Sequence, residues 1–288
     1  MNGESWTFPS GNGHFKIEEY AARVSGLFVN ENKKNLLWQG DTLPVLGTRI
    51  EGGDRMWLAP QWDVFDWDGN DVSTMRLPAE MDPGSWQGSQ DANQVKLQQT
   101  FLGSKMIREI SPFDSPKIQS ILPHTGYKVH DQVVTEKRLS SWHLLMVPHP
   151  ADILVHSAHS PVDYFGSPPS IHNGWIVAEK NVNAWKIGLS PESSGKIAIG
   201  AFSKDDPGGL VVIMASAAPN GTYIDYPPEG SLGTAIQIYN SGGGGFCEIE
   251  HHAPLETQSH QAFVFGFWGE FQKRLSAFNS LITQNLQF

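Results

Sequence analysis

A series of short apolar segments between residues 133 and 269 is the feature that most constrains how this chain can fold. Each segment is rich in valine, isoleucine or aromatic residues, and turn-forming residues separate it from the next. Such runs are typical of antiparallel strands, and a spacing of about ten to fifteen residues fits a sandwich of two sheets around one core. The segments are VVTEKRLSSWHLLMVP, ADILVHSAH, GWIVAEK, AWKIGLS, KIAIGAF, LVVIMASA, TYIDYPP, TAIQIYN, FCEIEHH and QAFVFGFWG.

Three other regions complete the expected fold. Residues 16–29 predict two strands of a meander, whereas residues 40–95, rich in Gly, Pro, Asp and Trp, predict long loops over a sheet. Apolar residues then recur at helical spacing over residues 270–286, which predicts an amphipathic helix that caps the sandwich. We therefore expect one all-β domain, residues 1–288, built as a large antiparallel β-sandwich with long loops and a C-terminal helix.

Charge and cysteine content argue against several classes of function. The chain has 30 acidic and 20 basic side chains and a formal charge of −10, which opposes binding to nucleic acids and anionic membranes. Cys247 is the only cysteine, so no internal disulfide can form. No segment reaches the roughly 18 apolar residues of a membrane span. We expect a soluble protein, cytoplasmic, or periplasmic or secreted if a signal peptide has been removed.

Three stretches carry a family resemblance. Residues 52–60 read GGDRMWLAP, residues 23–38 read RVSGLFVNENKKNLLW, and residues 246–255 read FCEIEHHAPL, followed by QAFVFGFW. Residues 52–60 resemble the Gly-Gly-x-Arg-x-Trp-x-x-Pro element of one family of galactose mutarotase-like (aldose epimerase-like) supersandwich proteins. Residues 23–38 are similar to the opening strands of these proteins, and residues 246–255 to their Glu-aliphatic-Glu strand before a proline turn and the last long strand. The resemblance departs at Asp54, where members commonly have histidine.

The resemblance implies a sugar-converting site on one face of a sheet. Sugar mutarotases of this superfamily use a histidine acid and a glutamate base in a groove on the concave sheet. Glu248 or Glu250 corresponds to such a glutamate, whereas no motif in the chain marks the histidine.

Period-two geometry places two carboxylates on one surface of the late strand. Glu248 and Glu250 project to one side together with His252, while Cys247 and His251 project to the other. Because close carboxylates cannot both ionise cheaply, one of them is expected to have a raised pKa and to act as acid or base near neutrality. The alternative is a solvated face, or ion pairs with Arg55 or Lys186.

The early part of the chain supplies candidate binding residues. Arg55 follows two glycines and precedes Trp57 in a context that resembles a loop, suited to presenting a guanidinium and an indole to a sugar. The alternative is that Arg55 anchors a loop to one of the glutamates and Trp57 fills the core. Gln61 and Trp62 extend this aromatic and acidic stretch as a possible carbohydrate platform.

The histidines supply candidates for the missing acid: His252 shares the carboxylate face, and His143 lies next to Trp142. The other candidates are His124, His130, His156 and His159. A zinc site built from His156 and His159 would need a turn, because an offset of three alternates between strand faces.

Other site motifs argue against metal, nucleotide and covalent chemistry. DWDGND lacks the twelfth-position glutamate of a calcium loop, SGGGGF lacks the lysine of a phosphate loop, and no Gly-x-Ser-x-Gly elbow occurs. We therefore expect neither a metal nor a cofactor.

The leading hypothesis is an aldose 1-epimerase-like isomerase that acts on a sugar or sugar derivative by general acid/base catalysis. The alternatives are a β-eliminating lyase in which Arg55 neutralises an enolate, a carbohydrate-binding module without catalysis, and a metal-assisted enzyme that uses His252 and neighbouring histidines. The partner is a small carbohydrate; its identity and the oligomeric state stay open. Catalytic candidates are Glu250, Glu248, His252 and His143, and binding candidates are Arg55, Trp57, Gln61, Trp62, Trp142 and Lys186.

Overall fold

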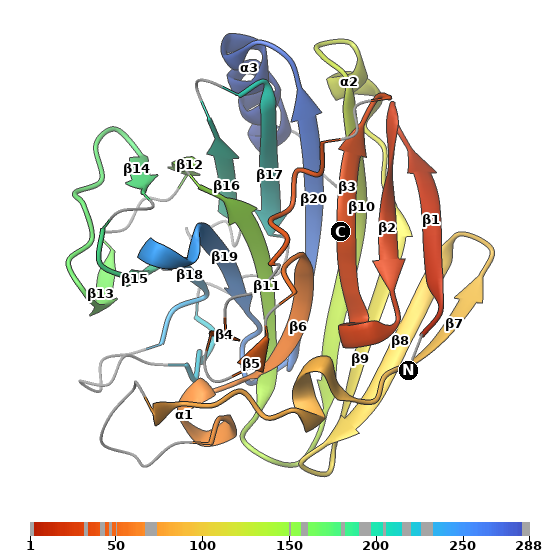
Figure 1. Ribbon diagram of the computed structural model, residues 1–288, viewed down its shortest axis with the longest axis vertical. Helices are drawn as coiled ribbons and strands as arrows, with labels where there is room; N and C mark the ends of the chain where they lie inside the picture. Colours follow the sequence, from red (N-terminus) through yellow and green to blue (C-terminus); the bar gives the residue numbers. More distant parts are fainter. Residues whose placement is uncertain are drawn as a thin grey trace.

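Two nine-stranded antiparallel sheets make up most of the computed structural model (Figure 1). The structure describes residues 3–31, 34–40, 44–45, 48–49, 51–66, 74–149, 151–156, 161–179, 182–189, 197–203, 206–214, 220–225 and 233–283.

The first sheet carries most of the candidate site residues. Its strands, in spatial order, are β1 (Ser5–Ser10), β2 (Gly13–Glu18), β3 (Arg23–Val29), β6 (Asp54–Ala59), β11 (Ser140–Pro148), β19 (Phe246–His252), β18 (Ile236–Asn240), β15 (Trp185–Leu189) and β13 (Val162–Phe165).

The second sheet packs behind the first. Its strands, in spatial order, are β14 (Trp175–Ala178), β12 (Ala151–His156), β16 (Ile197–Phe202), β17 (Gly208–Met214), β20 (Ser259–Trp268), β10 (His124–Val134), β9 (Ser104–Pro112), β8 (Gln94–Phe101) and β7 (Gln87–Asp91). Strands β10 and β20 lie against β2, β3 and β11 of the first sheet.

The remaining elements are short, apart from the last helix. They are the pair β4 (Pro44–Val45) and β5 (Thr48–Arg49), the helices α1 (Gln61–Val64), α2 (Pro116–Gln119) and α3 (Phe271–Thr283), and the single turns η1 (Tyr20–Ala22), η3 (Glu80–Gly84) and η4 (Gly242–Gly244). None of the helices in the described ranges is long and apolar enough to cross a membrane.

Strand β20 shows how alternation builds the layers. The ring of Tyr127 on β10 lies 5.2 Å from that of Phe15 on β2, and Tyr127 pairs with Val264, so this side of β20 faces the first sheet. Phe263 and Phe265 project the other way, into an apolar cluster with α3. The helix contributes Ala277, Phe278 and Leu281 to that cluster. Apolar burial on both faces therefore fixes β20 as a central strand.

The fold class expected from the sequence is confirmed, including the meander of β2 and β3 and the C-terminal helix on the sandwich. The helix is described as far as Thr283, so the expected residues 284–286 lie outside the described residues. One predicted strand, TYIDYPP, is wrong in its described part, because residues 222–225 form no strand.

The prediction of long loops over residues 40–95 is wrong at two places. Strand β7 borders the second sheet, and β6 lies in the middle of the first sheet with all six residues buried. Because both faces of β6 are buried, its sequence shows no alternation that would identify it as a strand.

Candidate active site

Strands β6, β11 and β19 lie side by side in the first sheet, and their pairing brings distant residues onto one surface. Arg55 lies opposite Leu144, which in turn lies opposite Glu250. Trp57, Trp142 and His252 form the neighbouring row. The early arginine and tryptophan and the late glutamates therefore share one face of the sheet.

This face points away from the second sheet. Asp54, the neighbour of Arg55, contacts the second sheet through Tyr127, whose hydroxyl donates a hydrogen bond of 2.5 Å to its carboxylate. Since successive side chains on a strand project to opposite sides, Arg55 and the residues in its row project outward from the sandwich. We call this surface the outer face of the first sheet.

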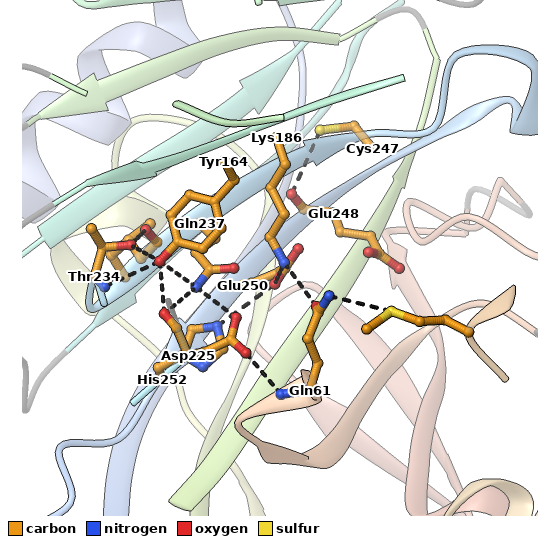
Figure 2. Close-up of polar contacts among 12 residues, drawn as sticks. Gln61, Tyr164, Lys186, Asp225, Thr234, Gln237, Cys247, Glu248, Glu250 and His252 are labelled. Atoms are coloured by element: carbon orange, nitrogen blue, oxygen red, sulfur yellow. Dashed lines mark hydrogen bonds and ion pairs between the residues drawn. The ribbon is translucent and has the colours of Figure 1, made fainter. Parts of the chain in front are cut away.

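Glu250 is an ion-paired carboxylate on the outer face. The Nζ of Lys186 on β15 donates to Oε2 of Glu250 at 2.9 Å, and lies 3.5 Å from Oε1 of Gln61 (Figure 2). Burial alone would raise the pKa of Glu250, but Lys186 and His252 outweigh it and hold the pKa below its usual value. Glu250 is therefore ionised and can accept a proton.

Glu248 has the opposite electrostatic setting. In Figure 2 its carboxylate lies to one side of the Lys186 ammonium group, which contacts Glu250 instead. Burial and the nearby charge of Glu250 raise the pKa of Glu248 to about 8 against the opposing effects of Lys186 and Arg55. The two carboxyl groups share one strand face, as predicted from their spacing, and their surroundings shift their pKa values in opposite directions.

His252 completes this row of polar groups. Its Nε2 lies 3.7 Å from Oε2 of Glu250, and its ring stacks on Trp142 with centroids 5.3 Å apart. Lys186 also lies over Trp142, with Nζ 5.1 Å from the ring centroid. The indole therefore positions both the imidazole and the ammonium group beside Glu250.

Arg55 and Trp57 lie on β6 and are buried, so the prediction that they occupy a loop is wrong. Asp82 of η3 accepts hydrogen bonds from both, at 2.5 Å from Arg55 Nη1 and 2.7 Å from Trp57 Nε1. Arg55 also donates to the carbonyl oxygen of Gly52 at 2.6 Å. The arginine is thus paired with Asp82 and not with Glu248 or Glu250, the partners that the alternative interpretation expected.

The two glycines before β6 have a steric reason. Gly52 has φ +77° and Gly53 has φ +86°, in the left-handed region that favours glycine. A Cβ at Gly52 would lie 2.1 Å from the carbonyl oxygen of Trp38, and one at Gly53 would lie 2.5 Å from that of Val24. The pair lets the chain enter the middle of the sheet between close neighbouring backbones.

Helix α1 borders the site toward solvent, since Gln61 and Trp62 are only partly buried. The backbone N–H of Gln61 donates to Oδ1 of Asp225 at 2.8 Å, which ties α1 to residues on the far side of the site. Gln61 and Trp142, two of the predicted binding residues, both contact the ammonium group of Lys186.

Three site residues were missed by the sequence reasoning. Gln237 lies opposite Glu250 in the sheet, and its Nε2 donates to Tyr164 Oη and to Asp225 Oδ2, each at 3.0 Å (Figure 2). Tyr164 in turn donates to the carbonyl oxygen of Asp225 at 2.8 Å. For Gln237, its period-two position on the strand was a sequence signal that could have placed it on the outer face. No sequence signal pointed to Tyr164 or Asp225.

His143 does not join the outer-face residues. It pairs with His251 in the sheet and projects toward the second sheet, where its Nε2 lies 2.7 Å from Oδ1 of Asp54. The expectation that it supplies the acid beside the glutamates is therefore corrected, because an odd offset from Trp142 turns it to the opposite face.

The other candidate histidines also lie elsewhere or cannot be placed. His124 is bonded to Asp114 at 2.8 Å, and His130 to Ser259 at 2.8 Å. The side chain of His156, all of His159, and residues 67–71 of the DWDGND motif lie outside the described residues. SGGGGF forms the hairpin connection, with η4, between β18 and β19.

No family model matches the chain, and no curated protein matches its sequence. The Slr1438 protein of Synechocystis sp. PCC 6803 superposes with a TM-score of 0.57 at 9% identity, covering 93% of this chain and 98% of that one. A galactose mutarotase-like protein of Lactobacillus casei gives 0.53 at 10% identity, covering 92% and 99%. The fold is galactose mutarotase-like.

An Escherichia coli K12 protein provisionally described as an aldose 1-epimerase shares this galactose mutarotase-like fold, with a TM-score of 0.54 at 10% identity and coverage of 92% and 99%. The resemblance noted in the sequence is therefore confirmed for the fold. Assignment to the family with the Gly-Gly-x-Arg-x-Trp-x-x-Pro element stays a prediction, although the geometry around Gly52 and Gly53 explains its glycines.

Proposed function

We propose that the protein is an aldose 1-epimerase-like isomerase that interconverts the anomers of a sugar or sugar derivative. The observation that carries the proposal is the pair of buried carboxyl groups on the outer face of β19: Lys186 donates a hydrogen bond to Glu250, while burial beside Glu250 raises the pKa of Glu248. The galactose mutarotase-like fold, shared with proteins whose names refer to this chemistry, supports the same assignment.

Anomer exchange needs a base that takes the proton of the anomeric hydroxyl and an acid that protonates the ring oxygen. Glu250 takes the proton from the anomeric hydroxyl while the Glu248 carboxyl gives its proton to the ring oxygen, and the bond between C1 and the ring oxygen breaks. After rotation of the open-chain aldehyde, the reverse transfers close the ring and restore both carboxyl groups. His252, stacked on Trp142, orients Glu250 and is the alternative acid.

The exposure of the candidate side chains suggests how each would take part in sugar binding. Gln61 and Trp62 at the partly buried edge of the site would contact the sugar hydroxyls and ring face, while Lys186 and Trp142 lie beneath them. Arg55 and Trp57 would shape the floor of the site through Asp82.

The direct test is anomer exchange measured by NMR magnetisation transfer across a panel of aldoses and uronic acids. We expect catalysed exchange with at least one sugar and a loss of about 100-fold or more in Glu250→Gln and Glu248→Gln. Glu109→Gln is the matched control, because Glu109 pairs with Lys96 at 2.7 Å on the second sheet, away from the site. Absence of acceleration for every sugar would reject the proposal.

The competing functions have weaker support. A β-eliminating lyase would use Arg55 to neutralise an enolate, but that guanidinium is paired with Asp82. A binding module would use tryptophan faces, but Trp57 and Trp142 are buried and only Trp62 among the candidate tryptophans is partly exposed. Formation of an ultraviolet-absorbing product would nevertheless favour the lyase, and sugar affinity that survives both glutamine substitutions without any turnover would favour the binding module.

A further inference from the structure

A second cluster of chemical groups lies on the inner side of β19, between the two sheets. His143 on β11, His251 on β19 and His260 on β20 are all fully buried. One ring nitrogen from each lies within 4.8 Å of the other two. The rings of His251 and His260 have centroids 4.3 Å apart, so the cluster spans the space between the sheets.

The cluster leaves ring nitrogens without hydrogen bonds. Both ring nitrogens of His251, Nδ1 of His143 and Nε2 of His260 have no hydrogen-bond partner among the described residues, although all are buried. A buried polar group without a partner costs roughly 1–3 kcal/mol, so several such groups facing one another call for an occupant.

The other ring nitrogens of His143 and His260 are held by hydrogen-bonding partners. His143 Nε2 lies 2.7 Å from Oδ1 of Asp54, and His260 Nδ1 lies 2.9 Å from Oγ of Ser141. Metal-binding histidines in proteins usually donate their second ring N–H to a carboxylate or another acceptor, which fixes the ring and its tautomer. The cluster has this outer arrangement already.

Two carboxyl groups and one guanidinium lie beside the cluster. Asp54 and Asp131 are fully buried, and Arg108 is the guanidinium paired with both of them. Asp131 Oδ2 lies 3.5 Å from Nε2 of His260.

We propose that His143, His251 and His260 bind one divalent transition-metal ion, with zinc as the best suited, since zinc is held in proteins by three imidazoles with a fourth position left for water. Zinc binds imidazole nitrogen at about 2.0–2.1 Å, so the three rings would move inward around it. The ion would join β11 and β19 of one sheet to β20 of the other. Because the site is buried, the metal would enter as the sheets assemble, and its binding energy would contribute to folding.

The test uses the full chain without an affinity tag. The protein is unfolded in denaturant in the presence of a chelator and then refolded with or without zinc sulfate. After excess metal has been removed, its metal content is measured by mass spectrometry. We expect about one zinc per chain and a higher melting temperature in the zinc-refolded protein. Refolding with cobalt(II) should give the visible absorption bands of a nitrogen-ligated, low-coordinate site.

Variants locate the site. His251→Gln and His260→Gln should each lose the bound zinc, while His14→Gln, a histidine of β2 outside the cluster, should retain it. Circular dichroism of each variant reports whether it has folded. The proposal is overturned if wild-type protein refolded with zinc folds as well as protein refolded without it and holds less than about a tenth of an equivalent of zinc. Full zinc content in a folded His251→Gln variant would overturn it as well.

Discussion

The ammonium group of Lys186 lies 2.9 Å from a carboxylate oxygen of Glu250, and both side chains are almost completely buried. The two residues come from β15 and β19, which are separated by β18. A buried ion pair is costly to break, since removal of one partner leaves an uncompensated charge in a low-dielectric interior. This pair therefore links the charge of the candidate base to the stability of the sheet.

Lys186→Met should destabilise the protein by about 3–5 kcal/mol, because the carboxylate of Glu250 would stay buried without its partner. Urea unfolding followed by circular dichroism measures the effect. Lys96→Met is the control, since Lys96 pairs with Glu109 at the surface and its loss should cost under about 1 kcal/mol. A Lys186→Met effect as small as the control would contradict the buried pair.

The pH dependence of stability should report the protonated state of Glu248. Its pKa rises from 4.5 to about 8, so its stabilising contribution is fully present below pH 4.5 and is lost as the pH rises through about 8. The charged or titratable groups around it are Glu250, Lys186, Arg55 and Tyr239.

We expect the free energy of unfolding of the wild type to decline, relative to Glu248→Gln, between about pH 5 and pH 8. If Glu248 is the acid, catalysed exchange should also fall above about pH 8, where the carboxyl loses its proton. Parallel stability curves for the two proteins over this range would show that Glu248 is ionised in the folded state.

Gly53→Ala should destabilise the fold by about 1–3 kcal/mol from its backbone conformation alone, with a further cost from the close carbonyl of Val24. Thermal unfolding measures the loss. Gly243→Ala is the matched control, because a Cβ there meets no atom within 4 Å and its φ is outside the left-handed region. Equal melting temperatures for the two variants would refute the steric account of the Gly-Gly element.

Phe278→Ala should cost about 3–5 kcal/mol, because the ring is buried between α3 and the second sheet, with its centroid 6.1 Å from that of Phe202. Denaturant unfolding measures this, and Gln272→Ala on the exposed side of the helix should be near neutral. Activity per folded molecule should not change in either variant, since α3 lies on the sheet opposite the site.

Alternation along the chain predicted the sandwich and the shared face of Glu248 and Glu250, because period-two geometry is local. It failed at Arg55 and Trp57, where a strand buried on both faces resembles irregular sequence and the partner Asp82 lies in a separate turn.

The inner histidines show the same limit. His143 and His251 are paired across neighbouring strands that are distant in sequence, and His260 reaches them from the other sheet. Nothing in the spacing of these residues encodes which strands become neighbours, so their convergence follows only from the topology. The local sequence pattern predicts to which side of its strand each side chain projects, whereas the order of the strands in the sheets determines which residues it contacts.

Strand β19 places Glu248 and Glu250 on the outer face of the first sheet and His251 toward the second sheet, and all of its residues are buried. Inserting or deleting a single residue within Phe246–His252 would exchange these two sets, placing acids among the core residues and turning His251 outward. Homologous proteins should therefore differ along this strand by substitution and not by insertion or deletion. Inserted residues should be tolerated instead in the glycine connection at Gly242–Gly244.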